Sequence, residues 1–338
     1  MLNPPHPLRK DWNIVGHAWA VDMLRQHVAR GEARHAYLFT GQRGVGRRTL
    51  ARRFAQALNC MAPSEPGVPC GVCEDCRRIE AGQHPDVTLI EAEAEGGTLK
   101  VEQVREQRRL IVLKPFQARY RVATFARFQE ANDAAANALL KTLEEAPAHA
   151  VLILTAESPE GLLPTIVSRC EVLRLQPAPL GEVQGLLEQG GVQPDQARLL
   201  AHISAGCPGA ALRLMQDSRA LAYRSEKLSE LLGLLPATRA NKFAYADRLA
   251  KDKAEMRGVL LLWLSFWRDV LWRAGGASTP IANIDHQEQI DALARSLSLL
   301  DARRRVEDLD RALRRLESNV NPRLLAEVLL LDWPRLSE

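Results

Sequence analysis

Residues 41–49, GQRGVGRRT, have the glycine spacing of a loop that binds phosphate. Four residues separate Gly41 from Gly46, and in such loops the backbone N–H groups at the start of the following helix face the anion. The motif then requires a lysine that reaches the β- and γ-phosphates and a serine or threonine that holds Mg²⁺. Arg47 and Arg48 stand at these two positions instead.

The two arginines change the chemistry expected of this loop. Arg47 is always charged and could lie against a phosphate, but the guanidinium of Arg48 has no lone pair for a metal and repels a divalent cation. Thr49 carries a hydroxyl one position out of register. We therefore expect a P-loop fold that has lost ATP hydrolysis, in a chain that is not expected to bind ATP. The simpler alternative is a turn that needs glycines for its shape alone. The candidate phosphate-loop residues are Gly41, Gly44, Gly46, Arg47 and Thr49.

A second part of an ATPase site is missing from the sequence as well. An active P-loop ATPase needs an acidic residue, often an Asp-Glu pair, at the end of a later strand to hold Mg²⁺ and orient water. The strand predicted at 121–125 is followed by Ala126 and Arg127. Two independent losses on two strands predict that this chain does not hydrolyse ATP.

Four cysteines with the spacing Cys-x9-Cys-x2-Cys-x2-Cys form a candidate metal site. Cys-x2-Cys spacing lets two thiolates reach one tetrahedral ion, and four thiolates close a structural zinc site that has no position for water. A redox Cys-x-x-Cys pair would not account for all four cysteines, and iron–sulfur ligation is a further alternative. His84 could replace the first cysteine as the fourth ligand. We predict a structural Zn²⁺ held by Cys60, Cys70, Cys73 and Cys76.

Composition excludes several classes of protein. The chain has 338 residues, 46% hydrophobic and 25% charged, with a mean hydropathy of −0.20, as in a globular protein of two to three domains. The longest apolar run, 259–267, is well short of the roughly 20 residues of a membrane span. Residues 1–12 lack the apolar core of a secretory signal, so we expect a cytoplasmic protein. A net charge of +4 does not indicate nucleic-acid binding. Segment 55–95 has no aromatic side chain to stack on bases, which argues against a free-standing zinc module that binds DNA.

Short apolar runs alternate with helical patterns over the first half of the chain, and these elements must position the candidate residues. Strands are predicted at 36–40, 87–90, 121–125, 151–155 and 171–175, and helices at 49–58, 100–112, 133–145 and 160–168. Strands that alternate with crossover helices form a parallel sheet that is covered on both faces. The prediction is a three-layer α/β domain in which the glycine loop connects the first strand to a helix.

The strand patterns end after the proline-containing segment 176–179, QPAP, and the rest of the chain is helical. We predict three parts: a P-loop-like domain over 1–178 that contains the zinc insertion 60–76, a small helical lid over 179–217, and an all-helical domain over 218–338.

Two segments carry a resemblance to a known family. Residues 133–147, DAAANALLKTLEEAP, and 163–170, LPTIVSRC, closely resemble the bacterial clamp-loader ATPases of the AAA+ class. The cysteine cluster and the early segment 12–18, WNIVGHA, are similar to that family too. Segment 319–325, NVNPRLL, resembles the family's helical collar less closely. The resemblance covers the chain from about residue 12 to 215.

This resemblance implies a subunit of the DNA polymerase III clamp loader, a pentamer that opens the ring-shaped sliding clamp and places it on primed DNA. The altered P-loop and the missing acidic pair resemble a non-hydrolysing member, which stabilises the hetero-pentamer beside the motor (gamma/tau) and delta subunits. The implied fold is an AAA+ P-loop domain, a helical lid and a helical collar for oligomerisation. The alternative is an active motor ATPase with a divergent loop, although such a subunit would keep Lys-Thr after Gly46 and Asp-Glu near 126–127.

One arginine of the family motif could still take part in chemistry. In the family, the arginine of Ser-Arg-Cys projects into the ATP site of the neighbouring motor subunit. This implies that Arg169, with Ser168 beside it, is a trans-acting arginine finger. An immobile guanidinium stabilises charge on the γ-phosphoryl oxygens, and fingers of this kind raise the rate on the order of 10³–10⁵-fold. An ordinary surface role for Arg169 is the alternative. The resemblance also places Gly209 where active members carry a lid arginine that senses nucleotide.

Overall fold

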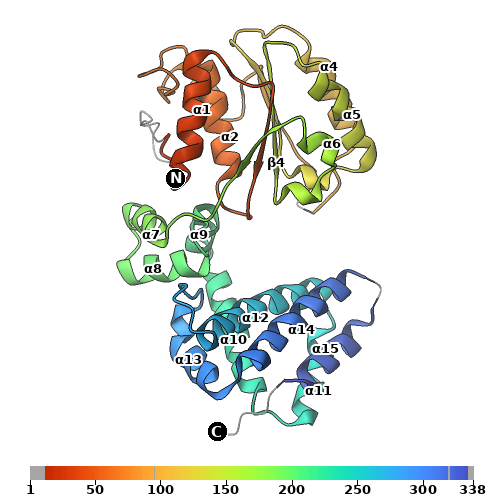
Figure 1. The fold of residues 1–338 in the computed structure, drawn as a ribbon. Helices are drawn as coiled ribbons and strands as arrows, with labels where there is room; N and C mark the ends of the chain where they lie inside the picture. The colour runs from red at the N-terminus through yellow and green to blue at the C-terminus, as the bar shows by residue number, and fades with distance from the viewer. Residues whose placement is uncertain (1–11, 95, 319, 334–338) are drawn as a thin grey trace. The chain divides into compact units, whose positions relative to one another are not determined.

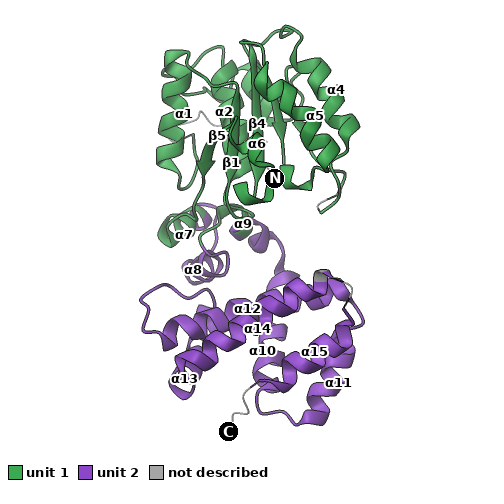
Figure 2. Ribbon diagram, turned by 45° about the vertical axis from the view of Figure 1, so that its right-hand side comes forward, with its two compact units in different colours: residues 1–186, 206–210 green, residues 187–205, 211–338 purple. Residues whose placement is uncertain are grey.

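The computed structural model describes residues 12–94, 96–318 and 320–333. Residues 1–11, which bear on the expected absence of a secretory signal, and Asn319, the first residue of the collar motif, lie outside the described residues. The chain divides into two compact units, residues 1–186 with 206–210 and residues 187–205 with 211–338 (Figure 2). Each unit has its own core.

Five parallel strands form the sheet of the first unit. They are β1 (Ala36–Thr40), β2 (Val87–Ile90), β3 (Arg121–Phe125), β4 (Ala150–Ala156) and β5 (Glu171–Arg174). Their order is β2-β3-β4-β1-β5, and Leu38 of β1 lies opposite Leu154 on one side and Val172 on the other. The strands are rich in apolar and β-branched residues because both faces of the sheet are covered. All five predicted strands are present, with ends that differ by at most one residue.

The helices of the first unit, together with two 3-10 turns (η), connect these strands. They are α1 (Ala18–Arg30), α2 (Arg47–Asn59), α3 (Glu74–Glu80), α4 (Val101–Ile111), η1 (Phe128–Glu130), α5 (Asp133–Glu144), η2 (Pro159–Gly161) and α6 (Pro164–Val167). The helices that follow are α7 (Leu180–Gln189), α8 (Pro194–Ile203), α9 (Pro208–Gln216), α10 (Ser218–Leu234), α11 (Arg239–Leu249), α12 (Lys253–Ala274), η3 (Ile284–His286), α13 (Gln287–Ser296), α14 (Leu299–Glu317) and α15 (Pro322–Leu331).

Helices cover the two faces of the sheet in separate layers (Figure 1). Successive side chains of a strand point to opposite faces, so Tyr37 and Phe39 belong to the core beneath α1 and α2, where Tyr37 packs edge-on against Phe54. Leu38 belongs to the core of the opposite face, together with Leu139 of α5. The predicted three-layer α/β domain is therefore confirmed.

The single helix predicted at 160–168 is wrong. Leu162 and Leu163 are extended and separate η2 from α6. The cause is Pro164, because a residue before proline is forced towards extended backbone and proline is tolerated only in the first turn of a helix. Two further helices, α1 and α3, lie in segments for which no helix was predicted.

The core of the second unit is built around α12. Trp263 and Trp267 are completely buried there, and the indole N–H of Trp263 donates to the carbonyl oxygen of Lys227 at 3.0 Å. The predicted lid segment 179–217 is divided between the two units, and the three-part division of the chain stays a prediction. No helix in the described part of the chain combines the length and the apolar character that a membrane crossing requires.

Candidate functional site

The glycine loop lies between β1 and α2, where the strand ends. Gly41, Gly44 and Gly46 all have positive φ, at 146°, 85° and 116°, which L side chains rarely adopt. A Cβ on Gly41 would also lie only 2.4 Å from the carbonyl oxygen of Leu175. α2 begins at Arg47, directly after the loop. The backbone thus forms the strand, loop and helix that the glycine spacing predicts.

Arg47 is buried in the first turn of α2. Only 8% of the residue is exposed, and its Nη1 has no hydrogen-bond partner among the described residues. Burial lowers the pKa of the Arg47 guanidinium; Glu157 opposes this shift and Arg127 adds to it. Arginine stays protonated under such conditions, so a buried positive charge occupies the position of the motif lysine. Thr49 is partly exposed two residues further along the helix.

Position 48 and the end of β3, which would supply metal ligands in a P-loop ATPase, are linked by ion pairs. Arg48 Nη1 lies 3.1 Å and Arg127 Nη1 lies 2.8 Å from Glu91 Oε2, and Arg48 Nη2 donates to Glu91 Oε1 at 3.2 Å. Arg127 Nε also donates to Glu130 at 2.9 Å. Burial lowers the pKa of Arg127, but the bonds to Glu130 and Glu91 outweigh it, so the net shift is upward. Both oxygens of Glu91 are therefore bonded to arginine.

Backbone contacts within the first unit hold the carbonyl groups of the glycine loop. The N–H of Gly209 donates to the carbonyl oxygen of Gly44 at 2.8 Å, and a Cβ at Gly209 would lie 3.0 Å from that oxygen. Nε2 of the buried His17 donates to the carbonyl oxygen of Val45 at 3.0 Å. Gly209 thus contacts the loop through its backbone, at the position where the family resemblance would place an arginine in active members.

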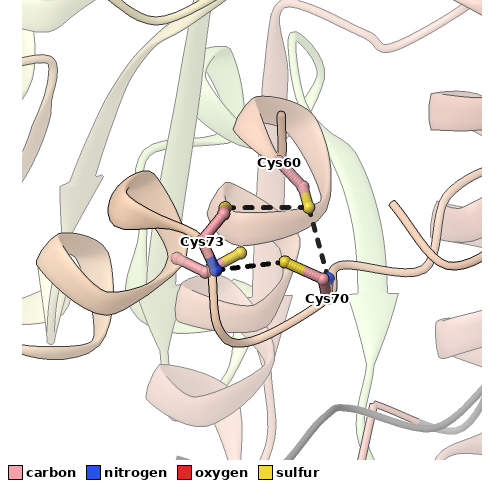
Figure 3. A group of neighbouring side chains, drawn as sticks. Cys60, Cys70 and Cys73 are labelled. Carbon is pink, nitrogen blue, oxygen red and sulfur yellow. Dashed lines mark hydrogen bonds between the residues drawn. The ribbon is translucent and has the colours of Figure 1, made fainter. Parts of the chain in front are cut away.

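Four thiols meet between the end of α2 and the start of α3. Cys60 follows α2, Cys73 precedes α3, Cys76 lies within α3, and Cys70 is on the connecting loop. Their Sγ atoms all lie within 4.8 Å of one another, and those of Cys60 and Cys73 are 4.0 Å apart. The N–H groups of Cys70 and Cys73 each donate to a neighbouring sulfur at 3.2 Å (Figure 3). Zn–S bonds of ~2.3 Å in a tetrahedral site place sulfurs about 3.8 Å apart, so the cluster needs little movement to hold zinc.

The chemistry of the donors also fits a zinc site. A hydrogen bond from the Cys76 thiol and another from the N–H of Cys70 outweigh burial and lower the pKa of Cys60 to about 5, which favours a thiolate. The pKa of Cys76 is raised because its thiol donates to Cys60 and is buried. His84 is already engaged: Nδ1 accepts from the N–H of Asp86 at 3.0 Å, and Nε2 contacts Asp75 at 3.3 Å. The geometry favours Cys60 over His84 as the fourth ligand.

Arg169 lies on a turn between α6 and β5, with 35% of its side chain exposed. Its Nη1 donates to the carbonyl oxygen of Thr165 at 2.8 Å, and its Nη2 donates to Glu144 at the end of α5. Ser168 ends α6, and its hydroxyl donates to the same Thr165 carbonyl at 3.3 Å. Ser168 therefore shapes the turn that presents Arg169.

The sequence patterns do not reveal the acidic partners of Arg48, Arg127 and Arg169, which are Glu91, Glu130 and Glu144. Glu91 directly follows β2, at the edge where the carboxyl ends of parallel strands gather, and that position was a usable signal. Glu144 is one of two acids at the end of a helix, where the macrodipole makes a negative charge unfavourable. That local conflict was a second usable signal.

The sheet order, the glycine loop after β1 and the helices on both faces define an AAA+ P-loop protein. Residues 16–179 match the family described as DNA polymerase III, delta subunit, and residues 218–335 match DNA polymerase III, delta subunit, C terminal. The chain belongs to this family and is a delta'-like clamp-loader subunit. The family resemblance seen in residues 133–147 and 163–170 is thereby confirmed.

Individual relatives agree with this assignment. The DNA polymerase III subunit delta' of Bacillus subtilis is 28% identical over 314 residues, which cover 91% of this chain and 93% of the relative. Subunit delta' of Pseudomonas aeruginosa is 37% identical over 201 residues, with coverage of 58% and 60%. Subunit tau of Escherichia coli is 34% identical over 235 residues, with coverage of 66% and 36%. The match thus spans little more than a third of the tau subunit's length.

Proposed function

We propose that the chain is a non-hydrolysing subunit of the DNA polymerase III clamp loader, where it stabilises a hetero-pentamer with the motor (gamma/tau) and delta subunits. In this role it supplies Arg169 to the ATP site of the neighbouring motor subunit while the loader places a sliding clamp on primed DNA. The chain would thus take part in the ATPase cycle of the complex without hydrolysing ATP itself.

The observation that carries the non-hydrolysing role is the ion-pair network of Arg48, Glu91 and Arg127. Hydrolysis at a P-loop needs Mg²⁺ on the β- and γ-phosphate oxygens, held by a loop hydroxyl and an acidic residue. Both positions carry a guanidinium here, and each of them is bonded to Glu91. A divalent cation would have to displace these bonds and then lie beside two groups that repel it. We infer that this chain does not hydrolyse ATP and does not bind it in a productive form.

Arg169 is the group that we assign to chemistry. Its side chain is about one-third exposed, and the planar guanidinium matches the geometry of phosphoryl oxygens. In a neighbouring ATP site it would stabilise the negative charge that spreads over the γ-phosphoryl oxygens in the transition state. Ser168 would contribute indirectly, through the hydrogen bond that shapes the turn.

The four cysteines are assigned to a structural Zn²⁺. When bound, the ion supplies a cross-link and has no open position for chemistry. Cys60 would join the end of α2 to Cys73 and Cys76 at the start of α3. α2 begins at the glycine loop and ends next to Cys60, so the zinc would fix the carboxyl end of α2, which is the end far from the loop.

A second candidate function is a divergent motor ATPase that uses Arg47 and Thr49. Three observations favour it, and the first two are the 34% identity to the tau subunit and the retained glycine conformations. Arg47 also has an unsatisfied Nη1 that could face a phosphate. This candidate predicts ATP turnover by the isolated chain, whereas the leading proposal predicts none.

Reconstitution with the motor and delta subunits of the same organism distinguishes the two candidates. We expect Arg169→Ala to leave assembly intact on gel filtration. ATP turnover should then fall on the order of 10³-fold at the one site that the arginine serves. Arg174→Ala, which removes an exposed arginine of β5, is the matched control and should leave turnover unchanged. The isolated chain should show no DNA-stimulated hydrolysis.

Unchanged turnover in a verified pentamer that carries Arg169→Ala would remove the finger assignment. Robust hydrolysis by the isolated chain, abolished by Arg47→Ala, would instead establish the motor ATPase.

A further inference from the structure

α5 ends in two adjacent acids, Glu144 and Glu145, and both are exposed. The carboxyl end of a helix carries a partial negative charge, so a carboxylate there is unfavourable unless a cation compensates for it. Glu144 has such a cation, because Arg169 forms an ion pair with it from the turn after α6. Among the described residues, no comparable ion pair involves Glu145. The two acids therefore occupy similar positions in the sequence, but only Glu144 forms an ion pair with Arg169.

The contacts of Arg169 fix the direction of its guanidinium. Nη2 is bonded to a single carboxylate oxygen, Glu144 Oε1, and Nη1 is bonded to the carbonyl oxygen of Thr165 at 2.8 Å. One anchor comes from α5 and the other from α6, so the plane of the guanidinium is held from two elements. Arginine has five N–H donors, and these two bonds leave the others available to an incoming anion.

We propose that Glu144 is a positioning residue for Arg169: by binding one Nη of the guanidinium it presents the remaining N–H donors, already oriented, to the γ-phosphoryl group in the neighbouring subunit's ATP site. This inference rests on the proposed function of Arg169 as a trans-acting finger. It adds a residue that touches neither nucleotide nor metal.

The physical reason for such a residue is the cost of ordering a long side chain. An unanchored arginine on a surface turn would lose its rotamer freedom only when the phosphoryl group arrives, and this loss would subtract from transition-state stabilisation. An anchored guanidinium has already lost that freedom. Exposed ion pairs contribute little to folding stability, so removing Glu144 should weaken catalysis far more than it weakens the fold.

The test uses the assembled loader and five variants of this chain, one of which is Arg169→Ala alone. In the loader, Glu144→Ala should lower kcat for ATP at the affected site about 10-fold and change KM less than about 2-fold, since it disturbs orientation in the transition state. Glu144→Gln keeps an oxygen that can accept a hydrogen bond from Nη2, so its kcat should return most of the way to the value of the unmodified chain. Glu145→Ala is the matched control and should behave as the unmodified chain. In an Arg169→Ala background, Glu144→Ala should have no further effect, because the group that it positions is gone.

The outcomes separate this inference from the proposal on which it rests. If Arg169→Ala lowers turnover but Glu144→Ala leaves kcat unchanged or raises it, Glu144 does not position the finger and the inference is overturned. An equal loss from Glu144→Ala with and without Arg169 also overturns it. If Arg169→Ala itself changes nothing in a verified pentamer, the proposed function has failed first. Melting temperature and gel filtration of every variant show whether folding and assembly are kept.

Discussion

Single residue identities decide the chemistry of the glycine loop. Arginine occupies positions 47, 48 and 127, where a P-loop ATPase uses a lysine, a hydroxyl group and an acid. Each replacement keeps or adds positive charge, and Glu91 compensates for two of the three through direct bonds. The loop glycines remain because they set backbone shape, which does not depend on whether a metal binds.

The thiol cluster gives a prediction at the residue scale. The purified chain should hold about one zinc per chain after gel filtration, as expected for a four-thiolate site. Cys76→Ser should abolish the zinc content, because the buried Sγ of Cys76 is one of four ligands and a hydroxyl is a poor replacement. Atomic emission and thermal unfolding measure the two effects, and the melting temperature should fall together with the metal.

Cys170→Ser is the matched control for the zinc measurement. Cys170 is partly buried and lies outside the cluster. Burial raises its pKa to about 12, which keeps its thiol protonated. This variant should retain zinc. Full zinc content in Cys76→Ser would mean that another residue completes the site.

At the scale of elements, α2 and the loop before β3 show how the unit joins its parts. α2 begins at the glycine loop and ends at Cys60, so one helix connects both candidate sites. The loop before β3 is held by Asp86, which directly precedes β2. Its carboxylate accepts N–H groups from residues 116–118 at 2.8–3.0 Å and one from Arg121 at 3.0 Å. A buried carboxylate that accepts this many hydrogen bonds fixes the start of β2 to the loop before β3.

The hydrogen bonds of the Asp86 carboxylate predict that the stability of the fold depends on pH. Burial raises the pKa of Asp86, but the three N–H donors and Arg121 outweigh burial, so the folded pKa lies below the ordinary value of 3.8. A group with a depressed folded pKa stabilises the fold above its unfolded pKa, and this stabilisation is lost as the pH falls through the folded value. Asp86→Asn should therefore cost about 2–4 kcal/mol at pH 7, and its difference from the unmodified chain should shrink below about pH 4. Urea unfolding at pH 7 and pH 3 tests this, and a cost that is the same at both values would contradict it.

At the scale of the whole molecule, the two units have separate hydrophobic cores. The second unit also has a buried carboxylate that accepts several hydrogen bonds, that of Asp269 in α12, which is completely buried. Its carboxylate accepts the backbone N–H of Ala282 at 3.1 Å, and the backbone and side-chain N–H groups of Asn283 at 2.8 and 2.7 Å. These bonds fasten the segment before η3 to the core helix.

Separate cores predict separate effects of mutation. Asp269→Ala leaves three N–H donors without their acceptor and should destabilise the second unit by about 3 kcal/mol. Calorimetry should show a shift of the transition that belongs to this unit, with zinc content unchanged because the cysteines belong to the first unit. Asp310→Ala, which breaks only an exposed pair with Arg314, is the control and should cost less than about 0.5 kcal/mol. Loss of zinc in Asp269→Ala would show that the two units do not behave independently.

The sequence by itself determined the strands, the glycine loop and the cluster of four cysteines. A buried parallel strand is a short apolar run, and the ligand spacing Cys-x2-Cys is a property of neighbouring residues, so both can be read locally. The same is true of the charge at positions 47, 48 and 127. At 160–168 the apolar pattern predicts one continuous helix, whereas Pro164 makes the residue before it extended and starts a new helix.

Only the tertiary structure decided which groups bind one another. Arg48 and Glu91 are 43 residues apart, and Arg169 and Glu144 are 25 residues apart. The contact of Gly209 with Gly44 joins segments that are further apart still. Arg48 and Glu91 meet because the loop before Arg48 follows β1 and Glu91 follows β2, and the carboxyl ends of these parallel strands lie at the same edge of the sheet. Strand order is set by the packing of complete elements, and no local pattern of residue types contains it.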